Sequence, residues 1–165
     1  MKKLFFIVLI LGFVFTANAQ KGSKVLNLGL GFAGSTIPVY IGLDYYFKNE
    51  VSLGGEIGWR RYNETWKHKD YHRDLYNFLF NANYHFSKLL ELPKDWDLYA
   101  GLNVGFYYWN DNIDYDGYEE DHTSGLGLGA QLGVRYYFNS KFAINLEFNG
   151  GNQVSNGKIG ISIKF

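Results

Sequence analysis

One acidic segment of the chain combines the residue types and the spacing of a calcium-binding loop. Asn112, Asp114 and Asp116 offer oxygen ligands at alternate positions, and Gly117 stands at the sixth position, as in the first half of a calcium loop. The twelfth position, where a bidentate glutamate would complete the site, is Thr123. An acidic loop exposed to solvent fits the same residues, so we predict neither a bound metal here nor a cofactor elsewhere in the chain.

Three histidines offer a second set of metal ligands. His68 and His72 are four residues apart, a spacing that places two ligands on one face of a helix. His122 lies in the acidic segment. However, lysines flank His68 and the surrounding residues lack helical periodicity, so we expect a surface loop without a metal ion.

A third set of charged residues lies within segments of alternating apolar and polar residues, on the polar face. Mixed charges that are confined inside a protein must pair to offset their desolvation. We therefore predict a network among Glu56, Arg60, Arg135 and Glu147, with a structural and not a catalytic role, because paired buried charges usually serve the fold. Other members of this face are Asp44, Asp97, Lys164, Asn103, Gln131 and Asn145.

The first residues of the chain have the organisation of a secretory signal peptide. Two lysines precede an apolar run from Leu4 to Phe15, and Ala17-Asn18-Ala19 supplies the small residues of a cleavage site. The run is too short for a membrane-spanning helix, which needs about 20 apolar residues. We predict that residues 1–19 are removed and that residues 20–165 form one mature domain.

The composition limits the functions that the mature domain can have. There is no cysteine, so no disulfide stabilises it. Two of the 16 lysines and arginines lie in the leader, so the mature domain has 14 basic and 16 acidic residues. This charge balance argues against nucleic-acid binding. Aromatic residues make up 19% of the chain, which also has 20 glycines and only two prolines; this combination favours many strands.

Eight segments of the mature chain alternate between apolar and polar residues, as strands with two different faces do. Their approximate bounds are 24–32, 39–47, 51–62, 74–86, 96–109, 125–138, 141–149 and 158–165. The fourth segment is irregular, because Leu75 and Leu79 fall on the face of its asparagines. An even number of strands of this length predicts an all-β fold, an antiparallel up-and-down transmembrane barrel.

Aromatic triplets end three of the even-numbered segments. Tyr45-Tyr46-Phe47, Tyr84-His85-Phe86 and Tyr136-Tyr137-Phe138 each precede a polar turn, as in an aromatic girdle at a membrane interface. The long polar connections, 63–73 and 110–124, fall on the opposite side. This asymmetry predicts an outer-membrane location, with long loops extracellular and both termini periplasmic.

The alternation does not by itself decide which face points outward. A soluble barrel with an apolar interior remains the alternative. The polar face is rich in glycine, asparagine and tyrosine but poor in lysine and glutamate, whereas a solvated exterior would carry many charges. We therefore expect the apolar rows to face lipid.

Together, the leader, the eight segments, the triplets and the terminal Ile161-Ser162-Ile163-Lys164-Phe165 resemble the small outer-membrane barrels of the OmpA, OmpX and OmpW type. The resemblance spans the mature chain. It implies that Phe165, preceded by Ile163 and Ile161, belongs to a signal that the barrel-assembly machinery reads. It also implies that outer-membrane lipids surround the protein, which we expect to be a monomer.

Outer-membrane lipid A deacylases are similar small barrels with a His-x-Ser-Asn motif late in the chain. The matching residues here are Gln153-Val154-Ser155-Asn156, with glutamine where the general base should stand. Without an imidazole to accept its proton, Ser155 would be a poor nucleophile. We expect a polar loop and no enzymatic activity.

These observations leave three hypotheses of function. An eight-stranded barrel is just wide enough for its own side chains, which argues against a general diffusion pore. We favour a non-enzymatic barrel with a structural role in the envelope, or with loops that bind an extracellular ligand. The alternatives are a narrow channel for small solutes and a lipid-modifying enzyme of the deacylase kind.

Overall fold

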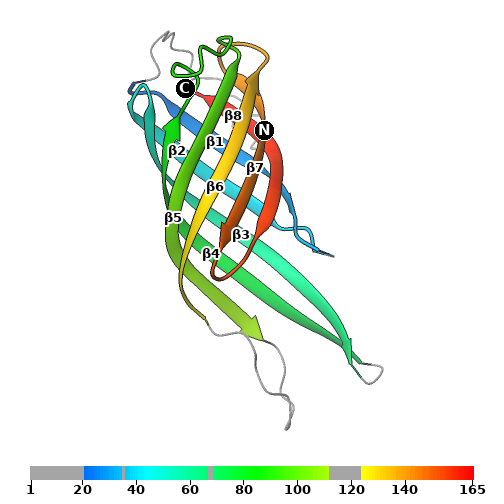
Figure 1. Cartoon of the computed structure of the whole chain (residues 1–165). Helices are drawn as coiled ribbons and strands as arrows, with labels where there is room; N and C mark the ends of the chain where they lie inside the picture. Colours follow the sequence, from blue (N-terminus) through cyan, green and yellow to red (C-terminus); the bar gives the residue numbers. More distant parts are fainter. Residues whose placement is uncertain (1–20, 35, 67–68, 112–123) are drawn as a thin grey trace, which may run out of the picture.

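Eight antiparallel strands follow one another around a closed barrel in the computed structural model (Figure 1). The model describes residues 21–34, 36–66, 69–111 and 124–165. The strands are β1 (Lys24–Phe32), β2 (Val39–Lys48), β3 (Val51–Trp66), β4 (Lys69–His85), β5 (Trp96–Asp111), β6 (Gly125–Tyr137), β7 (Phe142–Gly151) and β8 (Asn156–Lys164). Within these described ranges, no helix is long and apolar enough to cross a membrane.

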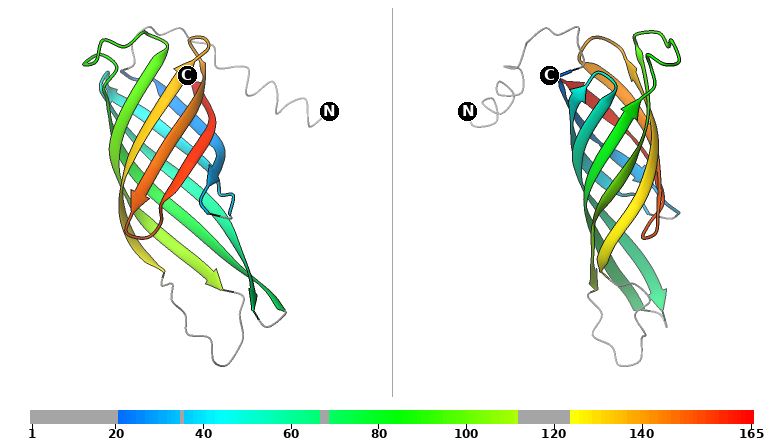
Figure 2. Two further views of the ribbon diagram at one scale, coloured as in Figure 1. Left: turned by 45° about the vertical axis from the view of Figure 1, so that its right-hand side comes forward. Right: turned by 60° about the vertical axis from the view of Figure 1, so that its left-hand side comes forward.

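Pairing between the first and last strands closes the barrel. β1 and β8 are antiparallel, from Val25 opposite Lys164 to Phe32 opposite Gly157. Near this end, the Lys24 amide donates to the Phe165 carbonyl over 2.8 Å. The described ends of the chain therefore lie beside each other, on the side of the short turns (Figure 2), as the strand count predicts.

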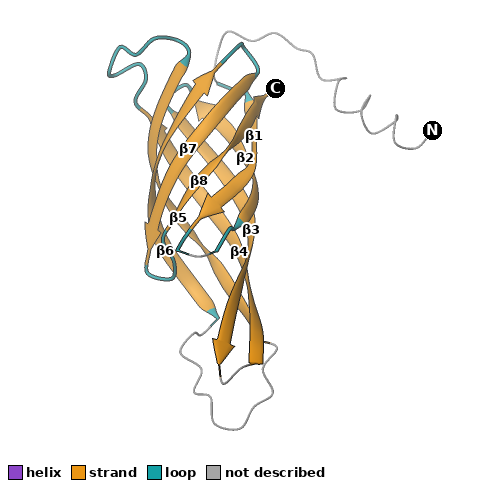
Figure 3. Cartoon of the chain, turned by 90° about the vertical axis from the view of Figure 1, so that its right-hand side faces the viewer, coloured by secondary structure: helices purple, strands orange, loops and turns teal. Residues whose placement is uncertain are grey.

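The predicted strands are confirmed in number and nearly in their bounds, but one predicted loop is wrong. Residues 63–66 and 69–73 continue the β3 and β4 ladder, in which Asn63 pairs with His72 and Trp66 with Lys69. The sequence pattern ended early because a hairpin that extends past the barrel has no apolar face to maintain. This hairpin projects at the end opposite the short turns (Figure 3).

The outer surface of the barrel is apolar and its interior is polar. Ile161 on β8 is 51% exposed, whereas the neighbouring Ser162 and the cross-strand Asn145 are buried. Rows of exposed Leu, Ile and Phe side chains recur on the other strands. The alternative of a soluble barrel with an apolar interior is therefore wrong, since so large an apolar exterior requires lipid.

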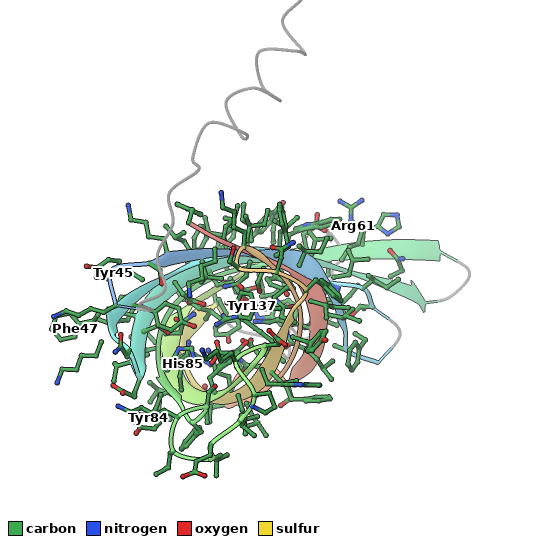
Figure 4. The ribbon with its side chains drawn as sticks, turned by 90° about the horizontal axis from the view of Figure 1, so that it is seen from above. Tyr45, Phe47, Arg61, Tyr84, His85 and Tyr137 are labelled. Atoms are coloured by element: carbon green, nitrogen blue, oxygen red, sulfur yellow. The ribbon has the colours of Figure 1, made fainter. Side chains whose placement is uncertain are left out.

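The aromatic triplets divide between the two faces. Four of their outer members, Tyr45, Phe47, Tyr84 and Phe138, are exposed, and the first three point away from the barrel in Figure 4. Their middle members are buried, and His85 and Tyr137 lie inside the ring of strands in the same view (Figure 4). The girdle thus contributes side chains to the interior as well.

Glycines on the inner wall make room for large tyrosine rings. A Cβ added to Gly133 would lie 2.2 Å from the Cζ atom of Tyr99, which stands opposite it on β5. Similarly, a Cβ on Gly127 would lie 2.4 Å from Cε2 of Tyr107. The two tyrosine rings can lie over the neighbouring strand, on the inner face of the barrel, only because that strand has no side chain at these positions.

We expect Gly133→Ala to destabilise the barrel by about 1–3 kcal/mol, the usual cost of overpacking a buried site. The Tyr99 ring cannot move easily, because Glu147 and Arg135 hold it on both sides. Urea unfolding of the protein in lipid vesicles measures the effect.

Gly55→Ala is the matched control, because an added Cβ there meets only the Leu79 carbonyl oxygen at 3.7 Å. We expect it to leave stability unchanged or slightly improved, since alanine loses less entropy than glycine. Equal unfolding midpoints for the two variants would contradict the packing argument.

Candidate functional site

A buried arginine organises the end of the lumen nearest the short turns. Arg135 on β6 is 1% exposed. Its Nη2 donates to Oδ2 of Asp44 over 2.6 Å, and its Nη1 donates to Oδ2 of Asp97 over 3.3 Å. Its guanidinium also lies 4.4 Å from the centre of the Tyr99 ring. Two carboxylates, one cation and an aromatic face thus meet in one cluster, where the cation offsets the desolvation of both acids.

Beside this cluster, three residues form the hydrogen-bond chain of a serine hydrolase. Ser52 Oγ lies 2.9 Å from Nε2 of His85, and His85 Nδ1 lies 2.7 Å from Oδ1 of Asp97. The order matches the Ser-His-Asp triad. However, the exposed fraction of Ser52 is 0%, so a substrate carbonyl cannot reach its hydroxyl in this conformation.

The Ser52, His85 and Asp97 chain has a clear structural role instead. Asp97 also accepts a hydrogen bond of 2.8 Å from the Tyr46 hydroxyl, and Tyr46 stacks on His85 with ring centres 4.5 Å apart. The hydrogen bonds satisfy polar groups that closure of the barrel removes from water.

A second charged cluster occupies the middle of the lumen. Lys158 Nζ on β8 donates to both carboxylate oxygens of Glu56 over 2.7 Å and to Oε1 of Glu147 over 3.0 Å. The Tyr99 hydroxyl donates to the other oxygen of Glu147 over 2.8 Å. Because the Tyr99 ring also contacts Arg135, this tyrosine joins the two clusters.

Amide and hydroxyl side chains fill the space between the clusters. Asn145 donates to Ser162, which donates to Asn27, and Gln131 donates to Asn83. A small cavity remains there, lined by polar side chains that include Asn27, Asn81 and Gln131. It has room for about one water molecule, so it is far from an open channel.

An apolar cluster lies at the end of the lumen away from the short turns. Leu75, Leu79, Tyr107 and Trp109 pack together, with Val154 from the loop between β7 and β8 against them. The lumen is therefore occupied by side chains at three levels among the residues that the structure describes.

Two arginines lie beside this apolar cluster. The Arg60 guanidinium stacks on Tyr62 and donates to its hydroxyl over 2.8 Å, while Arg73 lies over the Trp109 ring at 6.0 Å. Both side chains are buried. Their aromatic contacts stabilise the two cations away from water.

The predicted charge network is wrong in its partners. Glu56 and Glu147 do come together, but the cation between them is Lys158. Arg135 instead pairs with Asp44 and Asp97, and Arg60 contacts Tyr62 near the end away from the short turns. The four predicted residues all contribute to the lumen, but they belong to separate groups.

Sequence reasoning missed Lys158 and His85. Lys158 lies four residues before Ser162 on β8 and therefore on the same, inward face of the strand. The alternation of residues could have identified it. His85 has the same parity on β4 as the buried Asn81 and Asn83. Its place inside an aromatic triplet concealed this inward orientation.

The remaining predicted positions divide between the lumen, the surface and the part of the chain that the structure does not describe. Asp44, Asp97, Asn103, Gln131 and Asn145 are buried inside, and Lys164 is half-buried at the mouth, 6.0 Å from the centre of the Tyr137 ring. Ile161 and Phe165 are exposed and Ile163 is partly exposed. Asn112, Asp114, Asp116, His68 and His122 lie outside the described residues.

Two further candidates, the possible metal ligand His72 and the possible nucleophile Ser155, lie in described parts of the chain. Nδ1 of His72 lies 2.9 Å from Oδ1 of Asn63. Ser155 is exposed in the loop between β7 and β8, where Gln153 donates to the Leu126 carbonyl over 3.4 Å. Among the described side chains, no three His, Asp or Glu residues are grouped to hold a metal ion.

Comparison with known proteins agrees with this architecture. Residues 6–163 match a family model described as outer membrane protein beta-barrel domain. The structure is similar to OprG from Pseudomonas aeruginosa, with a TM-score of 0.68 and 12% identity over 90% of this chain and 99% of that chain. No similar protein is found among curated protein sequences.

Two further solved structures share the fold. The N-terminal β-barrel domain of OprF from Pseudomonas aeruginosa has a TM-score of 0.63 and 16% identity, over 88% of this chain and 98% of that one. Ail from Yersinia pestis, in complex with the heparin analogue sucrose octasulfate, has a TM-score of 0.58 and 14% identity, over 88% and 99%. Identities this low speak for the fold alone.

We expect Lys158→Met to destabilise the barrel by about 3–5 kcal/mol, because it leaves Glu56 and Glu147 buried without their cation. Adding Glu56→Gln and Glu147→Gln to the same variant should restore much of the loss, since no uncompensated charge then remains. Unfolding in urea, followed by tryptophan fluorescence, measures both.

Lys94→Met, at an exposed turn position, is the control for removing a lysine charge. In membranes of phosphatidylcholine alone, it should have little effect on the unfolding midpoint. A Lys158→Met variant as stable as this control would disprove the role of the central cluster.

Proposed function

Because this chain belongs to the family of outer membrane protein β-barrel domains, we propose that it is a non-enzymatic barrel that does not conduct, and that its outer hairpins are its binding surface. The family places it in the outer membrane of a Gram-negative bacterium. The barrel is the rigid part, and the long connections are the part that meets the surroundings of the cell.

The filled lumen is the observation that carries this proposal. The Arg135 cluster, the Lys158 cluster and the apolar cluster around Trp109 succeed one another along the axis. Passage of a solute would require several buried ion pairs to separate at once, at a cost of several kcal/mol for each unpaired charge. A narrow channel is therefore the less favoured function.

The proposal includes an orientation for the protein. Long connections on one side and short turns on the other are the asymmetry of outer-membrane barrels, so the β3 and β4 hairpin extends outward and both termini are periplasmic. Residues 1–19 direct export and are removed. Ile161, Ile163 and Phe165 serve as the signal for the barrel-assembly machinery during insertion into outer-membrane lipid.

The projecting hairpin supports a role in binding outside the cell. Arg61 on β3 pairs with Asp74 on β4 through two hydrogen bonds of 2.8 and 2.9 Å, and Arg61 also lies 5.4 Å from the centre of the Trp59 ring. These contacts stiffen the base of the hairpin. Ail, which has the same fold, forms a complex with a heparin analogue, so barrels of this size do bind ligands.

The ligand of this chain need not resemble that of Ail. The connection 110–124 contains six carboxylates and no lysine or arginine. A ligand that meets this connection would therefore carry positive charge or bind through metal ions or neutral groups, because like charges disfavour association.

Planar lipid bilayers test whether the barrel conducts. We expect the purified, folded protein to give no current steps above background, while a general porin in the same apparatus serves as the positive control. Reproducible steps that scale with the amount of inserted protein would refute the proposal in favour of a channel.

A shortened hairpin tests whether the projecting part is separate from the barrel body. Residues 64–71 can be replaced by Asn-Gly, because Asn63 and His72 already face each other in the ladder and a two-residue turn would join them. We expect this variant to insert into membranes and to keep its heat-modifiable migration on a gel. Failure to fold would mean that the hairpin belongs to the barrel core.

A further inference from the structure

The lysines whose side chains the structure describes are concentrated at one end of the barrel. Among the eight lysines whose side chains are described, only Lys158 lies elsewhere, inside the lumen. Lys164 lies in the mouth at the turn end, where it contacts Tyr137. The other six, which we name the basic collar, are Lys21, Lys24, Lys48, Lys88, Lys94 and Lys141.

The basic collar has an excess of positive charge. Its members are exposed, apart from the half-buried Lys141. The side chains of the same turns include only three carboxylates, Glu50, Glu91 and Asp95, and Glu50 lies 3.3 Å from Lys88. The rim therefore has three more lysines than acidic side chains among the residues that the structure describes.

The collar lies at the depth of the aromatic girdle. Lys48 follows the exposed Phe47, Lys141 precedes the exposed Phe142, and Lys94 is two residues from Trp96. Two residues of extended chain span about 7 Å, which a flexible lysine side chain can bridge. The ammonium groups therefore lie where the headgroups of a lipid leaflet begin.

We propose that the basic collar binds the phosphate groups of anionic phospholipids in the leaflet at the turn end of the barrel. Exposed lysines beside an aromatic girdle suit such headgroups, because the aromatic rings hold the interface and the ammonium groups neutralise the phosphates. A cell-wall polymer farther from the membrane is disfavoured, since the collar follows the girdle so closely. The inference rests on the membrane placement of the aromatic girdle and not on the proposed binding by the outer hairpins.

Spin-labelled lipids in vesicles that contain the folded full-length mature protein test this binding. We expect labelled phosphatidylglycerol to associate with the protein about two to three times more strongly than labelled phosphatidylcholine at low salt. The preference should disappear at high salt, because charges near a surface are screened within about 10 Å at moderate ionic strength.

Lys24→Gln, Lys48→Gln and Lys94→Gln in one variant remove three charges that form no ion pair among the described side chains. We expect the preference to fall to about one, while the same three positions changed to arginine keep it. Arg61→Gln, at the other end, should leave it unchanged. Heat-modifiable migration verifies that each variant folds.

Two results would overturn the proposal. One is equal association of the two lipids with the unaltered protein. The other is a preference that survives the three glutamine substitutions. Retention of the unaltered protein on purified peptidoglycan, without any lipid preference, would assign the collar to the cell wall and equally refute lipid binding. None of these outcomes depends on the bilayer-conductance or hairpin experiments, so the two proposals can fail separately.

Discussion

The constraint on which the structure depends is that no backbone polar group can be left unpaired in lipid. A sheet in that environment must therefore have no free edge, and the pairing of β1 with β8 removes the last one. Closure then forces each strand to alternate, because one face meets lipid and the other meets the lumen. The apolar rows and the inward asparagines are both consequences of that single pairing.

A closed barrel of eight strands creates a second problem in its interior. Polar side chains that face inward are removed from most water, so each needs a partner. The chain solves this with one cation for two carboxylates at each level: Arg135 serves Asp44 and Asp97, and Lys158 serves Glu56 and Glu147. Glycines such as Gly133 provide the room that the intervening tyrosines require.

The sequence predicts the architecture well because closure imposes a period of two. Strand β1 was predicted with the bounds that it has, and the inward positions of Asp44 and Arg135 follow from alternation alone. Partners within the lumen were not predictable in the same way. Side chains from strands that are distant in the sequence meet inside the barrel, as Glu56 and Lys158 do. The alternation of residues shows which side chains point inward, but it does not show which inward cation lies nearest to a given carboxylate. The β3 and β4 hairpin was missed for a related reason, since its outer part leaves the apolar environment that produces the pattern.

Because Tyr99 contacts both charged clusters, it affects how the protein unfolds. Its ring lies against Arg135 and its hydroxyl binds Glu147, so neither charged level can loosen without disturbing the other. Networks that share a member in this way are worth more together than separately. The interactions inside the barrel should accordingly break in one cooperative step and not one end at a time. A partly opened lumen would be a rare state under any conditions in which the protein stays folded.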